Sequence, residues 1–174
     1  MTYNPYAIAF PAPTFTVNSA DFVDGGPLPR SAYQPADESP ELSWGPLPAG
    51  TRSLVVTAFD ADAPIPGGLW HWLVKDIPAT TPGLPHGISA PNSTGGPPAF
   101  PADESGNALP NSLGQRAYTG AKPPPGSGVH RVFFCVTALG VETLELPADA
   151  SAAFLNIALI PHTLGRAIIV GTSE

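Results

Sequence analysis

Proline is the feature of this sequence that most restricts how the chain can fold. The chain has 24 prolines and 18 glycines among 174 residues, spread along it without a regular period. Proline breaks helix interiors and cannot donate a hydrogen bond in a central strand. Regular structure is therefore confined to the stretches between prolines, which predicts a mainly β protein with many turns, long loops and few helices.

Three apolar runs between these breaks are the best strand candidates. Ser53–Phe59 is rich in β-branched residues and predicts a central strand that is buried on both faces. Trp70–Ile77 alternates, which predicts His71, Leu73 and Lys75 on one face and Trp72 and Val74 on the other. The third and strongest run is His130–Leu139. Shorter strands are expected at Thr14–Val17, Leu42–Trp44, Leu144–Leu146 and Ala167–Val170.

Helical signals gather near the end of the chain. A helix is expected over Ser151–Leu164, capped by Asp149 or Ser151, with Pro161 kinking or splitting it. Pro78–Gly128 has no clear periodicity and is expected to form ordered loops. The length fits one domain over residues 1–174, with residues 1–13 as an irregular arm.

Charge and cysteine content exclude several classes of function. The net charge is −7 with only seven Lys and Arg, so the chain lacks the basic face of a nucleic-acid-binding protein. It has no run of 18 apolar residues and no secretory signal in Met1–Phe10, which predicts no integral membrane contact and a cytoplasmic location. Cys135 is the only cysteine; it lies in an apolar run and is expected to be a buried, inert thiol.

Two acidic residues and two histidines are the candidates for chemistry. Asp60 and Asp62 are two apart at a strand end, where extended geometry would point both the same way, although Asp-x-Asp-x-Pro is also ordinary turn chemistry. His71 lies within a strand, where a lone histidine is more often a buried core residue than a ligand. His130 begins a strand directly after a proline-rich loop, a common position for ligand-binding groups.

Catalytic alternatives have weaker support. The four residues contain suitable metal ligands, so a metal-dependent hydrolase is one hypothesis, but their spacing matches no compact zinc pattern. The sequence has no Gly-x-Ser-x-Gly elbow that would present a nucleophilic serine. We therefore predict no catalytic residues, no metal and no cofactor.

Two long motifs resemble those of the phosphatidylethanolamine-binding protein family. They are FDADAPIPGGLWHWLVKDIP at Phe59–Pro78 and YTGAKPPPGSGVHRVFF at Tyr118–Phe134. The segments DGGPLP at Asp24–Pro29 and SPELSWGPLPAGTRSL at Ser39–Leu54 agree, as does a C-terminal helix followed by VGT. The resemblance covers almost the whole chain and is strongest to the bacterial, Raf-kinase-inhibitor-like branch.

This resemblance implies a fold and a binding site. The expected fold is a large central antiparallel sheet packed near a smaller sheet, with a C-terminal helix and a short last strand. The family's pocket binds phosphate or a phospholipid head group such as phosphorylethanolamine. A cis peptide bond is implied at Ala63–Pro64. The predicted ligand-binding residues are Asp60, Asp62, Pro64, His71, Lys122, Pro124 and His130.

Three positions depart from the family pattern. Ala61 replaces the usual proline between the two acids, Lys122 replaces a small residue, and Val132 replaces an aromatic that can offer a hydroxyl to the ligand. Loss of that hydroxyl predicts a head group bound with one hydrogen bond fewer, about 0.5–1.5 kcal/mol.

The leading functional hypothesis is non-catalytic binding of a small anionic or zwitterionic ligand. The alternative is a regulatory inhibitor that docks on a kinase or protease through the loops around the pocket. Low charge, together with the resemblance, also favours contacts between two copies, so a homodimer is a further expectation.

Overall fold

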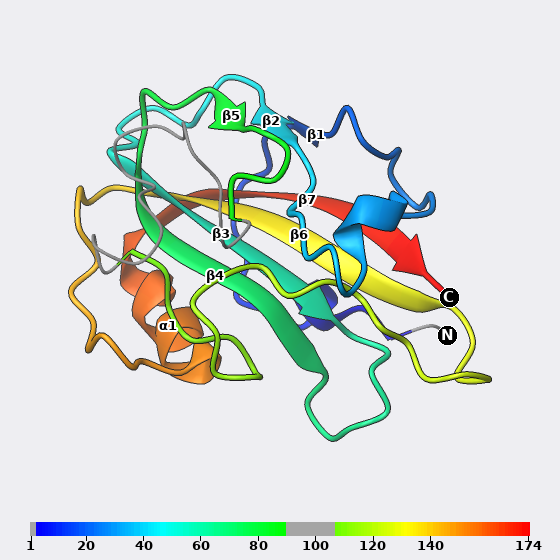
Figure 1. The fold of residues 1–174 in the computed structure, drawn as a ribbon. Helices are drawn as coiled ribbons and strands as arrows, with labels where there is room; N and C mark the ends of the chain where they lie inside the picture. The colour runs from blue at the N-terminus through cyan, green and yellow to red at the C-terminus, as the bar shows by residue number, and fades with distance from the viewer. Residues whose placement is uncertain (1–2, 90–106) are drawn as a thin grey trace.

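The structure, a computed structural model, describes residues 3–89 and 107–174. Most of its regular elements are strands (Figure 1). In chain order the elements are η1 Pro5–Ala7, β1 Val17–Asn18, η2 Arg30–Ala32, β2 Leu42–Trp44, β3 Ser53–Asp60, β4 Leu69–Pro78, β5 Gly83–Leu84, β6 His130–Leu139, α1 Ala152–Leu159, η3 Ile160–His162 and β7 Thr163–Ser173.

A four-stranded antiparallel sheet in the order β4-β3-β6-β7 forms the centre of the molecule. All eight residues of β3 are buried, which confirms the prediction of a central strand covered on both faces. Its continuous apolar sequence allows this, because only a strand between two packed layers can bury both sets of its side chains. The register pairs Ser53 with Leu139 and Asp60 with Val132.

A second layer packs on each face of this sheet (Figure 1). On one side lies the small antiparallel sheet β1-β2-β5, and on the other lies α1. The predicted mainly β fold, with a large sheet, a smaller sheet and a C-terminal helix, is therefore confirmed. The core on the small-sheet side includes Trp72, Tyr118 and Phe134, and the core on the helix side includes Val55, Leu73, Leu139, Leu155 and Leu159.

The C-terminal elements differ in length from the prediction. The α-helix spans only Ala152–Leu159; Ser151 caps it by accepting a hydrogen bond from the Phe154 backbone N–H. Pro161 lies in the short 3-10 turn that follows, and the chain is already a strand at Thr163. The last strand is eleven residues long rather than short, because β6 pairs with it from Thr163 to Ser173.

A β-bulge changes the predicted faces of β4. Ala58 pairs with Trp72 and Phe59 with Trp70, so His71 is the extra residue between them. The His71 and Trp72 rings both lie near Tyr118, with centroids 6.3 and 6.1 Å from it, whereas Leu73 faces the helix side. The expectation that His71 and Leu73 share a face is therefore wrong, since a bulge interrupts strict alternation.

Two other local expectations are also wrong. The cis peptide bond is Gln34–Pro35, and Ala63–Pro64 is trans. The two isomers of an X-Pro bond differ by only about 0.5–1 kcal/mol, so tertiary packing rather than local sequence selects between them. Leu144 is buried but forms no strand, because its N–H is bonded to the Asp76 carboxylate instead of to a neighbouring strand.

Part of the predicted loop segment Pro78–Gly128, residues 90–106, lies outside the described residues. The short strand β5 in the same segment was not predicted from the sequence. Among the described residues, no helix has the length and apolar character needed to cross a bilayer.

Candidate ligand-binding site

Three polar residues meet at one end of the large sheet because of its antiparallel order. β3 ends at Asp60, and β6 begins at His130 on the neighbouring strand. His71 lies near the start of β4, on the other side of β3. The loops after β3 and before β6 gather at this same end (Figure 1). All three side chains are almost completely buried.

A hollow of about 210 Å³ opens beside these side chains. Six of the seven predicted ligand-binding residues line it, and Asp62 does not. Apolar side chains form most of its remaining wall. The full lining is Asp60, Ala63, Pro64, Ile65, Leu69, His71, Lys122, Pro123, Pro124 and His130.

The Asp60 carboxylate organises the turn that borders the hollow. Its Oδ1 accepts hydrogen bonds from the backbone N–H groups of Asp62 and Ala63, at 2.8 and 2.9 Å. Its Oδ2 accepts from His130 Nδ1 at 2.8 Å. The sequence left open whether Asp60 stabilises a turn or belongs to a site. Its side chain does both, since Oδ1 bonds the turn and Oδ2 bonds His130.

Both ring nitrogens of His130 lie within hydrogen-bond distance of a polar group. Nδ1 donates to the Asp60 carboxylate, which only accepts. Nε2 lies 2.9 Å from Ser127 Oγ, and this hydroxyl also donates to the Pro124 carbonyl at 2.7 Å. Ser127 was missed in the sequence, although its position three residues before His130 offered a signal.

Glycines bring Ser127 to the histidine. Gly126 and Gly128, on either side of it, have φ of +79° and +82°, a region that residues with a Cβ rarely adopt. The loop therefore depends on both glycines to turn back sharply and place the Ser127 hydroxyl against the imidazole.

His71 contributes the unsatisfied polar atom of the site. Its Nδ1 lies 2.6 Å from the Thr119 carbonyl oxygen and donates to it, whereas its buried Nε2 has no hydrogen-bond partner among the described residues. Burial lowers the pKa of His71 below its ordinary value, although the Thr119 hydrogen bond and the nearby Asp60 carboxylate act in the opposite direction. At neutral pH the ring is therefore neutral, and its Nε2 is a hydrogen-bond acceptor without a donor.

Asp62 faces a different partner from the one expected. Its carboxylate binds the Arg131 guanidinium through two bonds of 2.6 and 2.8 Å, which hold the pKa of the carboxyl below its ordinary value. It also accepts a hydrogen bond from the Arg131 backbone N–H at 3.0 Å. Asp60 and Asp62 do not point the same way, because the chain leaves the extended conformation after Asp60 and alternation no longer applies.

Lys122 supplies the free charge of the hollow. It is exposed and has no hydrogen-bond or ion-pair partner among the described residues. Asp60, the acidic side chain of the described lining, is hydrogen-bonded to His130, so the Lys122 ammonium remains available to a ligand. Val132, at the position where the family pattern has an aromatic, is buried in the core and offers no polar group.

Nucleophilic and metal-assisted chemistry have few candidate residues here. The lining contains no hydroxyl or thiol group. Within residues 3–89 and 107–174, no three His, Cys, Asp or Glu side chains converge as metal ligands. Cys135 is buried, as predicted, and burial raises the pKa of its thiol.

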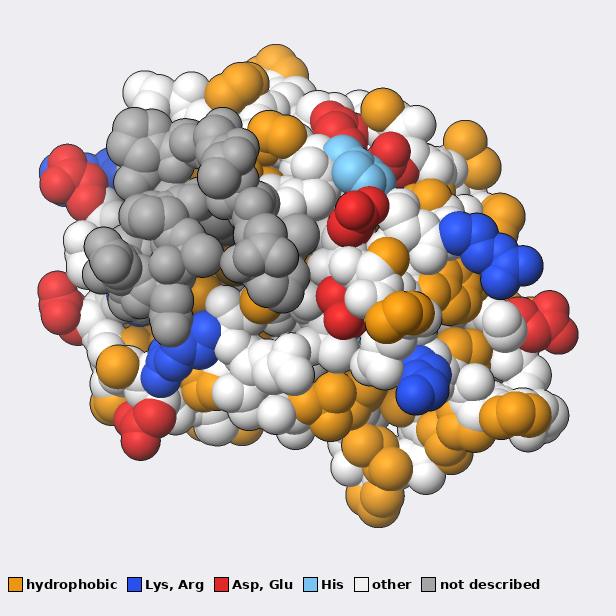
Figure 2. All heavy atoms as spheres, in the orientation of Figure 1, with side chains coloured by type: hydrophobic (Ala, Val, Ile, Leu, Met, Phe, Trp, Pro, Cys, Tyr) orange, Lys and Arg blue, Asp and Glu red, His pale blue; other side chains and the backbone are white. Residues whose placement is uncertain are grey.

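Basic side chains do not gather into a patch on the face shown in Figure 2, where they stand at separate places among acidic and neutral groups.

Comparison with known proteins places this architecture in a family. Residues 18–174 match the family model described as phosphatidylethanolamine-binding protein. The chain belongs to this family. Its relatives include the UPF0098 protein YbhB of Escherichia coli (strain K12), which is 37% identical over 157 residues, or 87% of this chain and 94% of YbhB. A protein of Aquifex aeolicus is 36% identical over 156 residues, covering 89% of this chain and 85% of that protein.

Solved structures agree with the family assignment. The crystal structure of Escherichia coli YbcL, described as a member of the mammalian PEBP family, superposes with a TM-score of 0.81 at 30% identity, covering 92% of this chain and 98% of YbcL. The relative LppC of Mycobacterium tuberculosis is 36% identical over 94% of this chain and 76% of its own length, and its name assigns it provisionally to the lipoproteins. A cytoplasmic location for this chain therefore stays a prediction.

Proposed function

We propose that the hollow beside Asp60, His71 and His130 binds a small anionic or zwitterionic group, of the phosphate-monoester or phospholipid head-group class, without transforming it. The observation that carries the proposal is the buried, unpartnered Nε2 of His71 in a hollow whose other buried polar groups are already paired. A buried polar atom without a partner is costly, so a ligand that pairs with it gains binding energy.

The proposed binding couples an anion to a proton. When His71 takes up a proton, Nε2 becomes a charged donor while Nδ1 keeps its bond to the Thr119 carbonyl. An oxyanion accepts from this N–H, and exposed Lys122 adds a second positive charge at the mouth. Asp60 already accepts three hydrogen bonds, so about one of its roughly four acceptor positions is left for a phosphorylethanolamine ammonium.

The apolar wall supports a head-group ligand over a free ion. Ile65 and Leu69 come from the loop after β3 and the start of β4, and Pro123 and Pro124 come from the second motif. A ligand that bears an alkyl or glycerol substituent next to its phosphate would bury apolar surface here.

Calorimetric titration with sulfate at several pH values tests the proposal, since the charge of sulfate does not change between about pH 5 and pH 8. The pKa of His71 is lowered, so the free protein is neutral there at pH 7 and must take up a proton to bind. Affinity is expected to rise as pH falls from about pH 8 to about pH 5, by at most about tenfold per pH unit. A pH-independent affinity would refute the proton-coupled binding.

Paired variants isolate the nitrogen concerned. His71→Asn places an amide donor near Nδ1 and removes Nε2, so it keeps the Thr119 bond and is expected to abolish the pH dependence. His162→Gln changes a histidine outside the hollow and is the matched control. Phosphorylethanolamine and inorganic phosphate, titrated side by side, distinguish head-group selectivity from simple anion binding.

The hypothesis of an inhibitor that docks on a kinase or protease rests on the resemblance alone and stays a prediction, as does the homodimer.

A further inference from the structure

Each strand of the large sheet contributes one buried polar side chain at the same end. Across the sheet order these are His71 on β4, Asp60 on β3, His130 on β6 and Ser173 on β7. Ser173 pairs directly with His130 in the β6–β7 register. The first three border the proposed head-group hollow, but Ser173 lines another.

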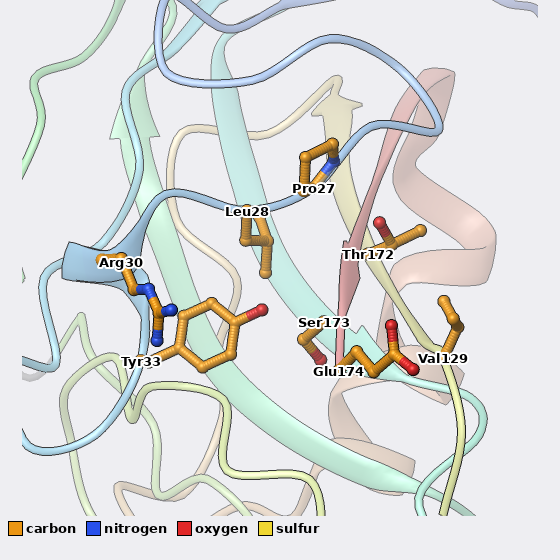
Figure 3. A pocket seen from close by; sticks show the side chains of 8 residues that line it. All are labelled: Pro27, Leu28, Arg30, Tyr33, Val129, Thr172, Ser173 and Glu174. Atoms are coloured by element: carbon orange, nitrogen blue, oxygen red, sulfur yellow. The ribbon is translucent and has the colours of Figure 1, made fainter.

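This second hollow lies on the β7 side of His130 and has a volume of about 270 Å³ (Figure 3). Ser173 is 2% exposed, and its Oγ has no hydrogen-bond partner within residues 3–89 and 107–174. Leu28 packs against Gly171, where a Cβ would approach Leu28 to 2.4 Å, so the N-terminal segment lies close over β7. The lining is Pro27, Leu28, Arg30, Tyr33, Val129, Thr172, Ser173 and Glu174.

Most of the seven Lys and Arg side chains of the protein contact a carboxylate, a backbone carbonyl or an aromatic ring. Five are engaged: Arg52, Lys75 and Arg131 in ion pairs, Arg116 with backbone carbonyls, and Arg166 with a carbonyl and two aromatic rings. Within the described part of the chain, Arg30 and Lys122 have no such partner, and each lines one of the two hollows. In a protein of net charge −7, the free positive charge is therefore found where ligands can enter.

The donors of the second hollow come from three side chains. In Figure 3 the Tyr33 hydroxyl is directed toward Ser173, and the Arg30 guanidinium lies beside the Tyr33 ring. The buried Ser173 hydroxyl has no hydrogen-bond partner among the described residues. A guanidinium and two hydroxyl groups match the acceptor oxygens of an oxyanion.

The two hollows share a wall. Tyr33 forms a parallel bridge with Ala121, the residue before Lys122. A Cβ on Gly120 would lie 2.5 Å from the Tyr33 carbonyl carbon, so the two segments are in close contact. The two hollows therefore lie close together, and each has one cationic side chain without an ion-pair partner among the described residues.

We propose that the hollow lined by Arg30, Tyr33 and Ser173 is a second oxyanion subsite, separate from the one beside His71. Arg30 supplies the charge, and the hydroxyl groups of Tyr33 and Ser173 donate hydrogen bonds. The Glu174 carboxylate at the same hollow opposes the bound anion and limits its affinity. The protein then binds one oxyanion on each side of His130.

Amide NMR during a sulfate titration separates the two sites. Amides of Tyr33 and Ser173 report the second hollow, and those of His71 and His130 report the first, so each proposal fails or stands on its own signals. Arg30→Gln is expected to weaken binding at the second hollow by about tenfold and leave the first unchanged. Lys122→Gln is expected to do the reverse and is the matched control.

Two further variants distinguish binding from structure. Ser173→Ala removes a buried hydroxyl that has no partner, so it is expected to leave stability unchanged or raised and to weaken sulfate binding by about threefold. Glu174→Gln is expected to strengthen it by a similar factor. The second subsite is refuted if sulfate shifts no Tyr33 or Ser173 amide, if Arg30→Gln titrates like the unmodified protein, or if Glu174→Gln weakens binding.

Discussion

The buried pair of Asp60 and His130 is the strongest test of how the site is held together. Their side chains are 8% and 2% exposed and their atoms lie 2.8 Å apart. Asp60→Asn keeps the oxygen that caps the following turn but replaces Oδ2, which accepts from His130 Nδ1, by an NH₂ group. This change removes the carboxylate acceptor of a buried hydrogen bond.

The size of the effect follows from burial. Hydrogen bonds to charged groups contribute about 1.5–3 kcal/mol, and removing one partner of a buried ion pair costs about 3–5 kcal/mol. Because the turn bonds to Oδ1 remain in Asp60→Asn, we expect a loss of about 2–4 kcal/mol in the free energy of unfolding. The interaction energy between the two residues should be about 2 kcal/mol or more.

Urea unfolding of Asp60→Asn, His130→Gln and the double variant measures this energy in a thermodynamic cycle. The same cycle on Arg52 and Glu142 is the control, since their side chains are 56% and 73% exposed and such pairs contribute about 0.2–1 kcal/mol. If the Asp60–His130 interaction energy is no larger than that of Arg52–Glu142, a strong buried interaction between these two residues is refuted.

Three other charged groups give predictions about stability. The pKa of His86 is raised by two carboxylate partners, so His86→Gln should lower the free energy of unfolding by up to about 1 kcal/mol below pH 6.5. Urea unfolding should show this difference disappear as pH rises through the raised pKa. The pKa of Asp62 is lowered by Arg131, so Arg131→Gln should lower the free energy of unfolding by about 1–2 kcal/mol above about pH 4. Acid titration of the variant and the unmodified protein should show this difference vanish as pH falls through the lowered pKa. Asp76→Ala should cost about 3–5 kcal/mol in thermal unfolding, because it leaves the nearly buried Lys75 ammonium without its partner; a loss under about 1 kcal/mol would contradict this.

The strands that could be predicted are those whose own side chains are mostly apolar and therefore indicate burial. Ser53–Phe59 and His130–Leu139 are apolar at nearly every position, and they form the two central strands. The ends of β7 could not be predicted in this way. Its polar residues Thr163 and Ser173 adopt strand geometry because β6 pairs with them, a long-range cause that has no local signal.

The sequence grouped six residues that line one hollow, but it did not predict their geometry. His71 faces the hollow because of a bulge between two paired positions, and alternation predicted the opposite face. Asp62 lies two residues from Asp60, yet its direction is set by Arg131, 69 residues away. The Ser173 hydroxyl gave no signal, since a single serine near a strand end is ordinary in any sequence.

The most direct test of the account is a crystal structure of the protein grown in sulfate at about pH 5, where His71 carries a proton in the complex. The account predicts a sulfate in the hollow with one oxygen about 2.7–3.2 Å from His71 Nε2, while Nδ1 still donates to the Thr119 carbonyl. A sulfate that binds elsewhere while His71 Nε2 pairs with another protein group would contradict it.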